Sequence, residues 1–159
     1  MTMYVRDGGD GPVLVLLHAF PCDGRMWEPQ AAAAAAAGWR VLVPDLPGFG
    51  ESSLVPGHPS LPIVAESVIA MVEERGVDRY VVGGVSLGGY VAFEVIRRAL
   101  PRLQRLVLID TTAVADHPAR RDGRRQDIAK VQAGGIEALI PELPSRWLLP
   151  THVSDNALV

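Results

Sequence analysis

The sequence predicts an α/β fold in which a parallel, twisted sheet carries helices on both faces. Four apolar runs have the length of strands and lack an alternation of apolar and polar residues, as is typical of strands covered on both sides. These runs are Val13–Leu17, Arg40–Pro44, Tyr80–Val85 and Leu103–Ile109. A helical pattern lies in each interval between them. Strand and helix therefore alternate, which predicts right-handed crossovers and a parallel sheet.

The first part of the chain adds an edge strand and a helix to this pattern. We expect a short edge strand at Met3–Arg6, because Asp7–Pro12 is a strong turn signal. A helix is expected at Arg25–Ala37, since the seven consecutive alanines Ala31–Ala37 favour helix and Gly38 follows as a stop.

Two more helices flank the third buried strand. Leu61–Arg75 has apolar residues at helical spacing and ends at Gly76, and Leu87–Leu100 follows the strand directly. Beyond Thr111 the apolar strands cease. The chain then predicts helices at Pro118–Ala133 and Gly135–Leu143.

Composition limits what the protein can do. The 159 residues are enough for one domain with a proper core, and a net charge of -3 argues against nucleic acid as a partner. The single cysteine, Cys22, excludes an internal disulfide, and no apolar run is long enough to cross a membrane. We therefore expect a cytoplasmic protein. The arginines at 120, 121, 124 and 125 alternate with Asp116, Asp122 and Asp127, which favours a solvated helix face over an anion site.

A glycine-rich segment around one serine carries the clearest chemical signal. Gly84-Val85-Ser86-Leu87-Gly88 fits G-x-S-x-G at a strand-to-helix junction, where small residues let backbone segments pass closely. Ser86 would project its hydroxyl above the sheet, and the helix that begins at Leu87 would favour a developing oxyanion beside it. The alternative is a tight turn in which the Ser86 hydroxyl caps the helix.

Two further motifs stand at the ends of earlier strands. His18-Ala19-Phe20-Pro21 is similar to an H-G-x-P turn, and Asp45 to Ser52 resembles a D-x-x-G-x-G-x-S loop. Together with the G-x-S-x-G segment, they occur in the order and spacing of the α/β-hydrolase family, which the chain resembles over nearly its whole length. Ligands in open parallel sheets bind at this end of the strands.

The resemblance implies a serine hydrolase that cleaves an ester, lactone or related acyl bond, without a cofactor or a metal. Ser86 would be the nucleophile, and the backbone N–H groups of Phe20 and Leu87 would form the oxyanion hole. His18 would orient the oxyanion loop by hydrogen bonding, and Asp45 would accept hydrogen bonds within its loop. Gly84 and Gly88 would support the turn, and a serine nucleophile disfavours epoxide opening, for which the family uses an aspartate.

The acid and the base of the family's triad follow the serine on later strands, after a helical cap. We assign residues 1–112 to a partial hydrolase core and 113–159 to the beginning of that cap. Asp110 is a candidate acid, with capping of the next turn as its alternative role. His58, His117 and His152 do not fit the expected place of the base. Ala19 stands where the family usually has glycine, and it requires a negative φ.

These departures leave two alternatives to an active hydrolase. The chain is a catalytically inactive, hydrolase-like binding module, or it is an incomplete fragment. A serine hydroxyl needs a base within hydrogen-bond reach. The last apolar strand would also be an unpaired edge, which predicts self-association through that strand. The expected partners are thus a small-molecule acyl substrate and a second copy, with no nucleic acid and no membrane.

Overall fold

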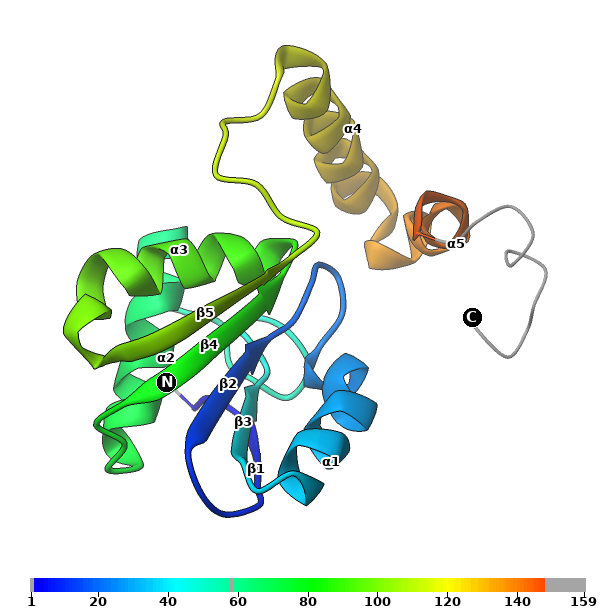
Figure 1. The fold of residues 1–159 in the computed structure, drawn as a ribbon. Coiled ribbons are helices and arrows are strands. Elements are labelled where there is room, and N and C mark those ends of the chain that lie inside the picture. The colour runs from blue at the N-terminus through cyan, green and yellow to red at the C-terminus, as the bar shows by residue number, and fades with distance from the viewer. Residues whose placement is uncertain (1, 58, 148–159) are drawn as a thin grey trace. The chain divides into compact units, whose positions relative to one another are not determined.

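The computed structural model describes residues 2–57 and 59–147 (Figure 1). The chain divides into two compact units, Met1–Ala113 and Val114–Val159. The first unit contains the sheet and the three helices that pack on it, and the second is helical in its described part. None of the helices within the described ranges is long and apolar enough to span a bilayer.

The sheet has five strands in the order β1-β3-β2-β4-β5. Their bounds are β1 Val5–Gly8, β2 Val13–Leu17, β3 Arg40–Pro44, β4 Tyr80–Val85 and β5 Leu103–Ile109. Strands β2, β3, β4 and β5 are parallel, whereas β1 pairs antiparallel with β3. This arrangement confirms the predicted fold class. The edge strand begins two residues later than Met3, because Val5 is the first residue that pairs with β3.

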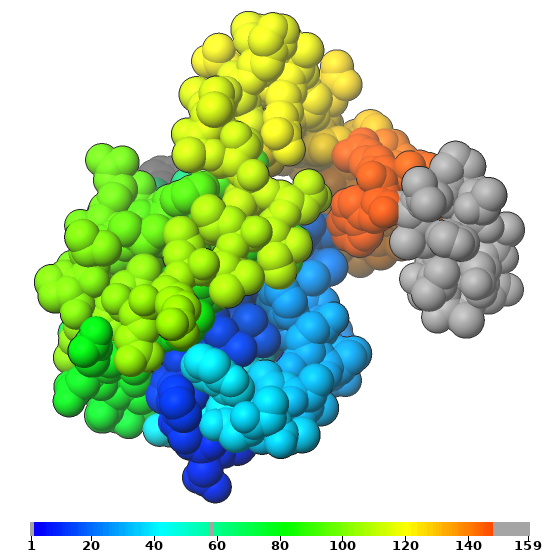
Figure 2. Space-filling model, in the orientation of Figure 1, coloured from blue at the N-terminus to red at the C-terminus, as the bar shows by residue number. Residues whose placement is uncertain are grey.

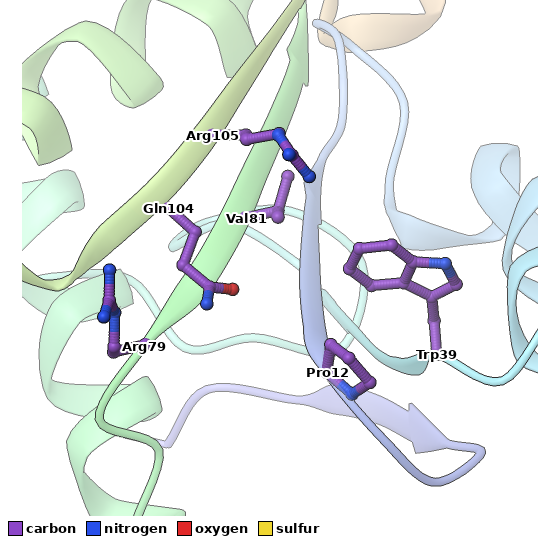
Figure 3. Close-up of a pocket in the computed structure, with 6 residues that line it drawn as sticks. All are labelled: Pro12, Trp39, Arg79, Val81, Gln104 and Arg105. Carbon is purple, nitrogen blue, oxygen red and sulfur yellow. The ribbon is translucent and has the colours of Figure 1, made fainter.

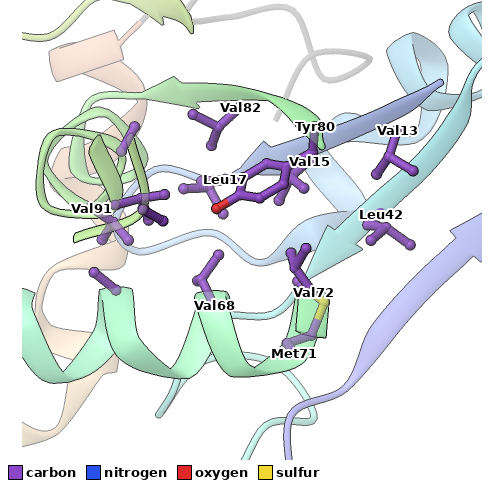
Figure 4. Packing of buried hydrophobic residues seen from close by; sticks show 14 of the residues in the cluster. Val13, Val15, Leu17, Leu42, Val68, Met71, Val72, Tyr80, Val82 and Val91 are labelled. Atoms are coloured by element: carbon purple, nitrogen blue, oxygen red, sulfur yellow. The ribbon is translucent and has the colours of Figure 1, made fainter. Parts of the chain in front are cut away.

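Two helices cover one face of the sheet and form the larger core with it (Figure 4). They are α2, Leu61–Glu74, and α3, Leu87–Ala99. Val68 and Val72 of α2 and Val91 of α3 are fully buried against Val15 and Val82 of the sheet. Burying an aliphatic side chain of this kind contributes about 1.5–3 kcal/mol. The core thereby fixes α3 against the strands whose ends carry the predicted motifs.

The opposite face carries α1, Glu28–Ala36, and a smaller core of Leu16, Trp27, Val41 and Val43. The helix expected at Arg25–Ala37 therefore begins later, and a 3-10 turn at Gly24–Trp27 precedes it. Pro29 in the first turn of α1 explains the boundary, since proline has no N–H to donate and fits best at the start of a helix. Helices on both faces match the prediction.

The described part of the second unit consists of one long helix followed by shorter helical segments. Helix α4, Pro118–Gly134, is followed by 3-10 turns at Ile136–Ala138 and Ile140–Glu142 and by α5, Leu143–Trp147. The continuous helix expected at Gly135–Leu143 is wrong. Gly135 has a φ of 73°, and Pro141 cannot donate to a preceding carbonyl.

The arginines of α4 lie on a solvated surface, as predicted. No residue of α4 is buried. Arg124 pairs with Asp116 at 2.6 Å, and Arg125 pairs with Asp122 at 2.8 Å. These local ion pairs neutralise much of the cluster, so it does not form an anion site.

Among the residues that the structure describes, strand β5 is an edge of the sheet and pairs with β4 alone. Its residues Val107, Leu108 and Ile109 are each more than 40% exposed, and the yellow-green atoms of this region lie on the surface in Figure 2. Within β5 there is no proline, and Arg105 is the one charged residue. An apolar edge of this kind can pair with another strand.

We expect the chain to self-associate through antiparallel pairing of β5 with β5 of a second copy. A register centred on Val107 sets Arg105 opposite Ile109, so like charges do not face each other directly. Val107→Lys places like charges at the centre of this pairing and should keep the protein monomeric in sedimentation velocity. Leu54→Lys is the control, because Leu54 is an exposed loop residue far from β5 in the sequence. A wild-type chain that is monomeric at every concentration contradicts this expectation.

Candidate active site

Ser86 occupies the sharp turn between β4 and α3. Its backbone has φ 49° and ψ -110°, a left-handed region that strongly disfavours any residue with a side chain. Ser86 is the N-cap residue of α3, yet its side chain makes no capping hydrogen bond. The alternative in which this hydroxyl caps the helix is therefore wrong. The turn presents the serine without engaging its hydroxyl locally.

Two glycines on either side of Ser86 make this turn possible. A Cβ on Gly84 would lie 2.6 Å from the backbone nitrogen of Gly89, and a Cβ on Gly88 would lie 2.6 Å from the carbonyl carbon of Leu17. Real Cβ atoms do not come this close to backbone atoms. The absence of both side chains lets the first turn of α3 rest on the end of β2. A Cβ on Gly88 would also lie 2.9 Å from the His18 carbonyl oxygen, so the His18–Pro21 segment begins against this turn of α3.

His18 is fully buried, and both of its ring nitrogens are used. Nδ1 donates to the carbonyl of Ala19 at 2.9 Å, while Nε2 accepts the N–H of Leu46 at 2.9 Å. The Leu46 N–H can donate only to a nitrogen without a proton, so the ring is neutral. Burial lowers the pKa of His18, which agrees with this state. His18 thus links the segment after β2 to the loop after β3 and is not free to act as a base.

The segment after His18 forms a tight turn that leaves one N–H unused. The N–H of Cys22 donates to the carbonyl of Ala19, and the N–H of Ala19 donates to the sulfur of Met26 at 3.3 Å. Within residues 2–57 and 59–147, the N–H of Phe20 has no hydrogen-bond partner. Ala19 is not among the residues with a positive φ, which agrees with the negative φ expected of an alanine at this position. The N–H of Leu87, at the first position of α3, likewise has no partner within the helix.

Asp45 is fully buried and organises the loop after β3. One carboxylate oxygen accepts from the Arg6 guanidinium at 2.7 Å and from the Gly24 N–H at 2.8 Å, and the other accepts from the Glu51 N–H at 3.0 Å. These bonds give Asp45 the structural role that was expected of it. Phe49 of the same loop packs edge-on against His18, with ring centroids 5.2 Å apart, and against Phe20 at 6.1 Å.

Asp110 and Thr111 follow β5 at the same end of the sheet as Ser86. Asp110 has a φ of 42°, and it and Ser86 are the two described residues other than glycine with a positive φ. The Ser86 N–H donates to the carbonyl of Ile109 at 3.1 Å, and the Thr111 hydroxyl donates to the carbonyl of Ser86 at 3.0 Å. Asp110 therefore lies in the segment bonded to Ser86, and its role as an acid stays a prediction.

The structure does not assign a base. His18 is the one described histidine of the first unit, and both of its nitrogens are engaged. His117 belongs to the second unit, where it caps α4 by accepting from the Ala119 N–H. His58 and His152 lie outside the described residues.

A surface pocket lies at the opposite end of the strands from Ser86. It has a volume of about 300 Å³ and is lined by Pro12, Trp39, Arg79, Val81, Gln104 and Arg105 (Figure 3). Most of these residues precede or begin strands, whereas the three motifs follow strands. This pocket is therefore separate from the candidate active site. Among the described residues, no cluster of histidine, cysteine and acidic side chains could hold a metal ion.

The site agrees with the comparison of this chain with known protein families. It contains a serine at a strained strand-to-helix turn, two backbone N–H groups and a buried histidine in the neighbouring turn. The family model described as alpha/beta hydrolase fold matches residues 12–151. The chain belongs to the α/β-hydrolase fold family. The parallel sheet and flanking helices agree with this assignment, which confirms the resemblance seen in the sequence.

Several members of the α/β-hydrolase family are similar to this chain. A thermophilic esterase from Thermogutta terrifontis, solved with malate bound, is 33% identical, with a TM-score of 0.89 over 98% of this chain and 57% of the other. A pimeloyl-(acyl-carrier protein) methyl ester esterase from Aeromonas hydrophila is 38% identical over 69% of this chain and 41% of its own. Bifunctional epoxide hydrolase 2 from Sus scrofa is 30% identical over 74% of this chain and 22% of its own.

These α/β-hydrolase relatives are longer than the present chain, which spans between 22% and 57% of their lengths. Their names include both esterases and an epoxide hydrolase. The comparisons therefore establish the family and leave the bond that is cleaved to be argued from the site.

Sequence reasoning missed three contacts in the site. The Thr111 hydroxyl bonds the Ser86 carbonyl, the Met26 sulfur holds the Ala19 N–H, and Phe49 touches His18. For the bond from Thr111, the sequence offers only a weak signal, a threonine shortly after a strand. Residue spacing carries no signal for the other two, because both depend on how separate loops pack.

Gly88→Ala tests the close approach of α3 to β2. The added Cβ would collide with the Leu17 carbonyl group, and we expect a loss of about 3 kcal/mol in the free energy of unfolding. Gly8→Ala is the matched control in the same unit, because no atom lies within 4 Å of its Cβ position and its φ is not positive. The control should change stability by less than about 0.5 kcal/mol. Urea unfolding followed by tryptophan fluorescence measures both, and equal effects would contradict the packing argument.

The buried, neutral His18 predicts a pH dependence. Burial sets its pKa in the folded protein below the ordinary value of 6.5, so the unfolded chain binds the proton first as the pH falls. The free energy of unfolding should fall below pH 6.5, by up to about 1.4 kcal/mol per pH unit. His18→Gln can still accept the Leu46 N–H but does not titrate, so it should lack this component. Urea unfolding of both proteins between pH 7.5 and 5 measures it, and identical pH slopes would contradict the assignment.

Proposed function

We propose that this chain carries the nucleophile and the oxyanion hole of a serine hydrolase that acts on an ester, lactone or related acyl bond. The observation that carries the proposal is the strained turn at Ser86, which leaves the hydroxyl without a hydrogen-bond partner among the described residues. A strained, non-glycine φ persists only where the surrounding structure holds it, and such positions cluster at active sites.

The chemistry follows from the groups beside Ser86. Attack of its Oγ on an acyl carbon converts the carbonyl oxygen into an oxyanion, which the N–H groups of Phe20 and Leu87 would stabilise. Each such donor is worth about 3 to 4 kcal/mol in the transition state. The acyl–oxygen bond of the substrate then breaks, and the leaving oxygen takes up the proton that Ser86 has lost. Water next attacks the acyl-enzyme, which releases the carboxylic acid and restores the Ser86 hydroxyl. The positive end of the α3 dipole adds to the stabilisation of the oxyanion.

The nucleophile favours acyl transfer over epoxide opening. Relatives of both kinds are similar to this chain. The family resemblance implies an aspartate nucleophile for epoxide opening, whereas this chain has Ser86 at that position. An alkoxide from serine suits a carbonyl carbon, because the resulting oxyanion meets preformed N–H donors. We assign no cofactor to this reaction.

A binding module is the second candidate function, favoured by one observation. The described part of the first unit offers no free histidine to take the proton from Ser86. Without a base, the oxyanion hole and substrate binding can still supply a rate about 10³ to 10⁴ over water. Slow but serine-dependent reaction is therefore compatible with the hydrolase proposal, whereas no reaction favours the binding module.

Labelling with a fluorophosphonate probe tests the proposal on the chain as it is. Wild type should be labelled, and Ser86→Ala should lose at least about 99% of the label, because the probe reacts with an activated serine. Ser67→Ala should label like wild type, since the Ser67 hydroxyl bonds the Ile63 carbonyl within α2. Equal labelling of wild type and Ser86→Ala, or no labelling of wild type, would refute the nucleophile. Hydrolysis of p-nitrophenyl acetate but not of styrene oxide is expected for the proposed bond class.

A further inference from the structure

We propose that Thr111 is a positioning residue for Ser86, acting through the backbone of the nucleophile; this rests on the proposed function. The Thr111 hydroxyl donates to the Ser86 carbonyl at 3.0 Å. The Ser86 N–H donates to the carbonyl of Ile109, two residues earlier, at 3.1 Å. Both polar backbone groups of Ser86 are therefore bonded by the last residue of β5 and the segment that follows it.

This pair of bonds restrains a conformation that Ser86 would not keep by itself. The residue has φ 49° and ψ -110°, which only a surrounding structure can maintain. The segment that supplies the bonds is itself unusual, since Asp110, between Ile109 and Thr111, has a φ of 42°. The turn at Asp110 therefore separates the two groups that bond Ser86, the Ile109 carbonyl and the Thr111 hydroxyl. The positive φ of Asp110 thus lies between the two residues that bond the backbone of Ser86.

The Thr111 side chain is also held in place from the other direction. A Cβ on Gly89 would lie 2.6 Å from the Thr111 Cβ, so the first turn of α3 packs directly on this threonine. The bond from this hydroxyl to the Ser86 carbonyl is part-buried. Helix α3 alone would bond this carbonyl through the N–H groups of Gly89 and Tyr90. Thr111 adds a third donor that the helix does not provide.

Thr111→Val removes the hydroxyl at constant shape and is the central variant. In fluorophosphonate labelling, we expect its maximal rate to fall about tenfold, as for the loss of one neutral hydrogen bond, with half-saturation by the probe unchanged. Thr111→Ser keeps the hydroxyl and should restore the rate to within about threefold. Ser67→Ala, which loses a hydroxyl-to-carbonyl bond in α2, should label like wild type.

Amide hydrogen exchange gives a readout that does not depend on reactivity. Thr111→Val should speed exchange of the Ser86 N–H about tenfold, because the turn opens more often, while the buried Val91 in the same helix keeps its wild-type rate. Unchanged Ser86 exchange in Thr111→Val, or a failure of Thr111→Ser to restore it, overturns the inference. An unlabelled wild type with the expected exchange pattern refutes the nucleophile but leaves Thr111 as the restraint on this turn. A uniform rise across α3 shows general destabilisation and also overturns it.

Discussion

The candidate site depends on the close approach of the first turn of α3 to the ends of the two strands that flank β4. Gly88 allows contact with the carbonyl group of Leu17 at the end of β2, and Gly89 allows contact with Thr111 after β5. A Cβ at either position would lie less than 3.0 Å from these atoms, so the helix or its neighbours would have to shift. The close approach sets the first turn of α3 against Leu17 and His18, where the segment that contains Phe20 begins. The geometry of the proposed oxyanion hole is thus a consequence of backbone packing.

Buried polar side chains hold the loops around this packed centre. His18 and Asp45 are fully buried, and their hydrogen bonds are made largely to backbone groups of neighbouring loops. Leaving such buried groups without partners would cost about 1–3 kcal/mol each. Their bonds therefore favour this loop arrangement over any that would leave these groups unpaired. Both residues connect separate loops around Ser86 through these hydrogen bonds.

Much of this arrangement could be predicted from the sequence, because it follows from the spacing of apolar residues and from the order of the motifs along the chain. Unbroken apolar runs gave the parallel strands, and the motifs that follow those strands had to meet at one edge of the sheet. The strained φ of Ser86 and the bond from Thr111 could not be predicted, since they arise only when β4, β5 and α3 are packed together. The 3-10 turn before α1 and the broken helix after Gly135 were missed for a local reason: single prolines and a positive φ outweighed helical propensity.

The most direct test is a crystal structure of the chain after reaction with a fluorophosphonate. The phosphorus should be bonded to the Ser86 Oγ, and the phosphoryl oxygen should lie about 2.7–3.1 Å from both the Phe20 and the Leu87 backbone nitrogens. Such an adduct copies the tetrahedral geometry of the transition state, so it reports where an oxyanion would sit. A phosphoryl oxygen directed away from both nitrogens, or an adduct on another residue, would contradict the account.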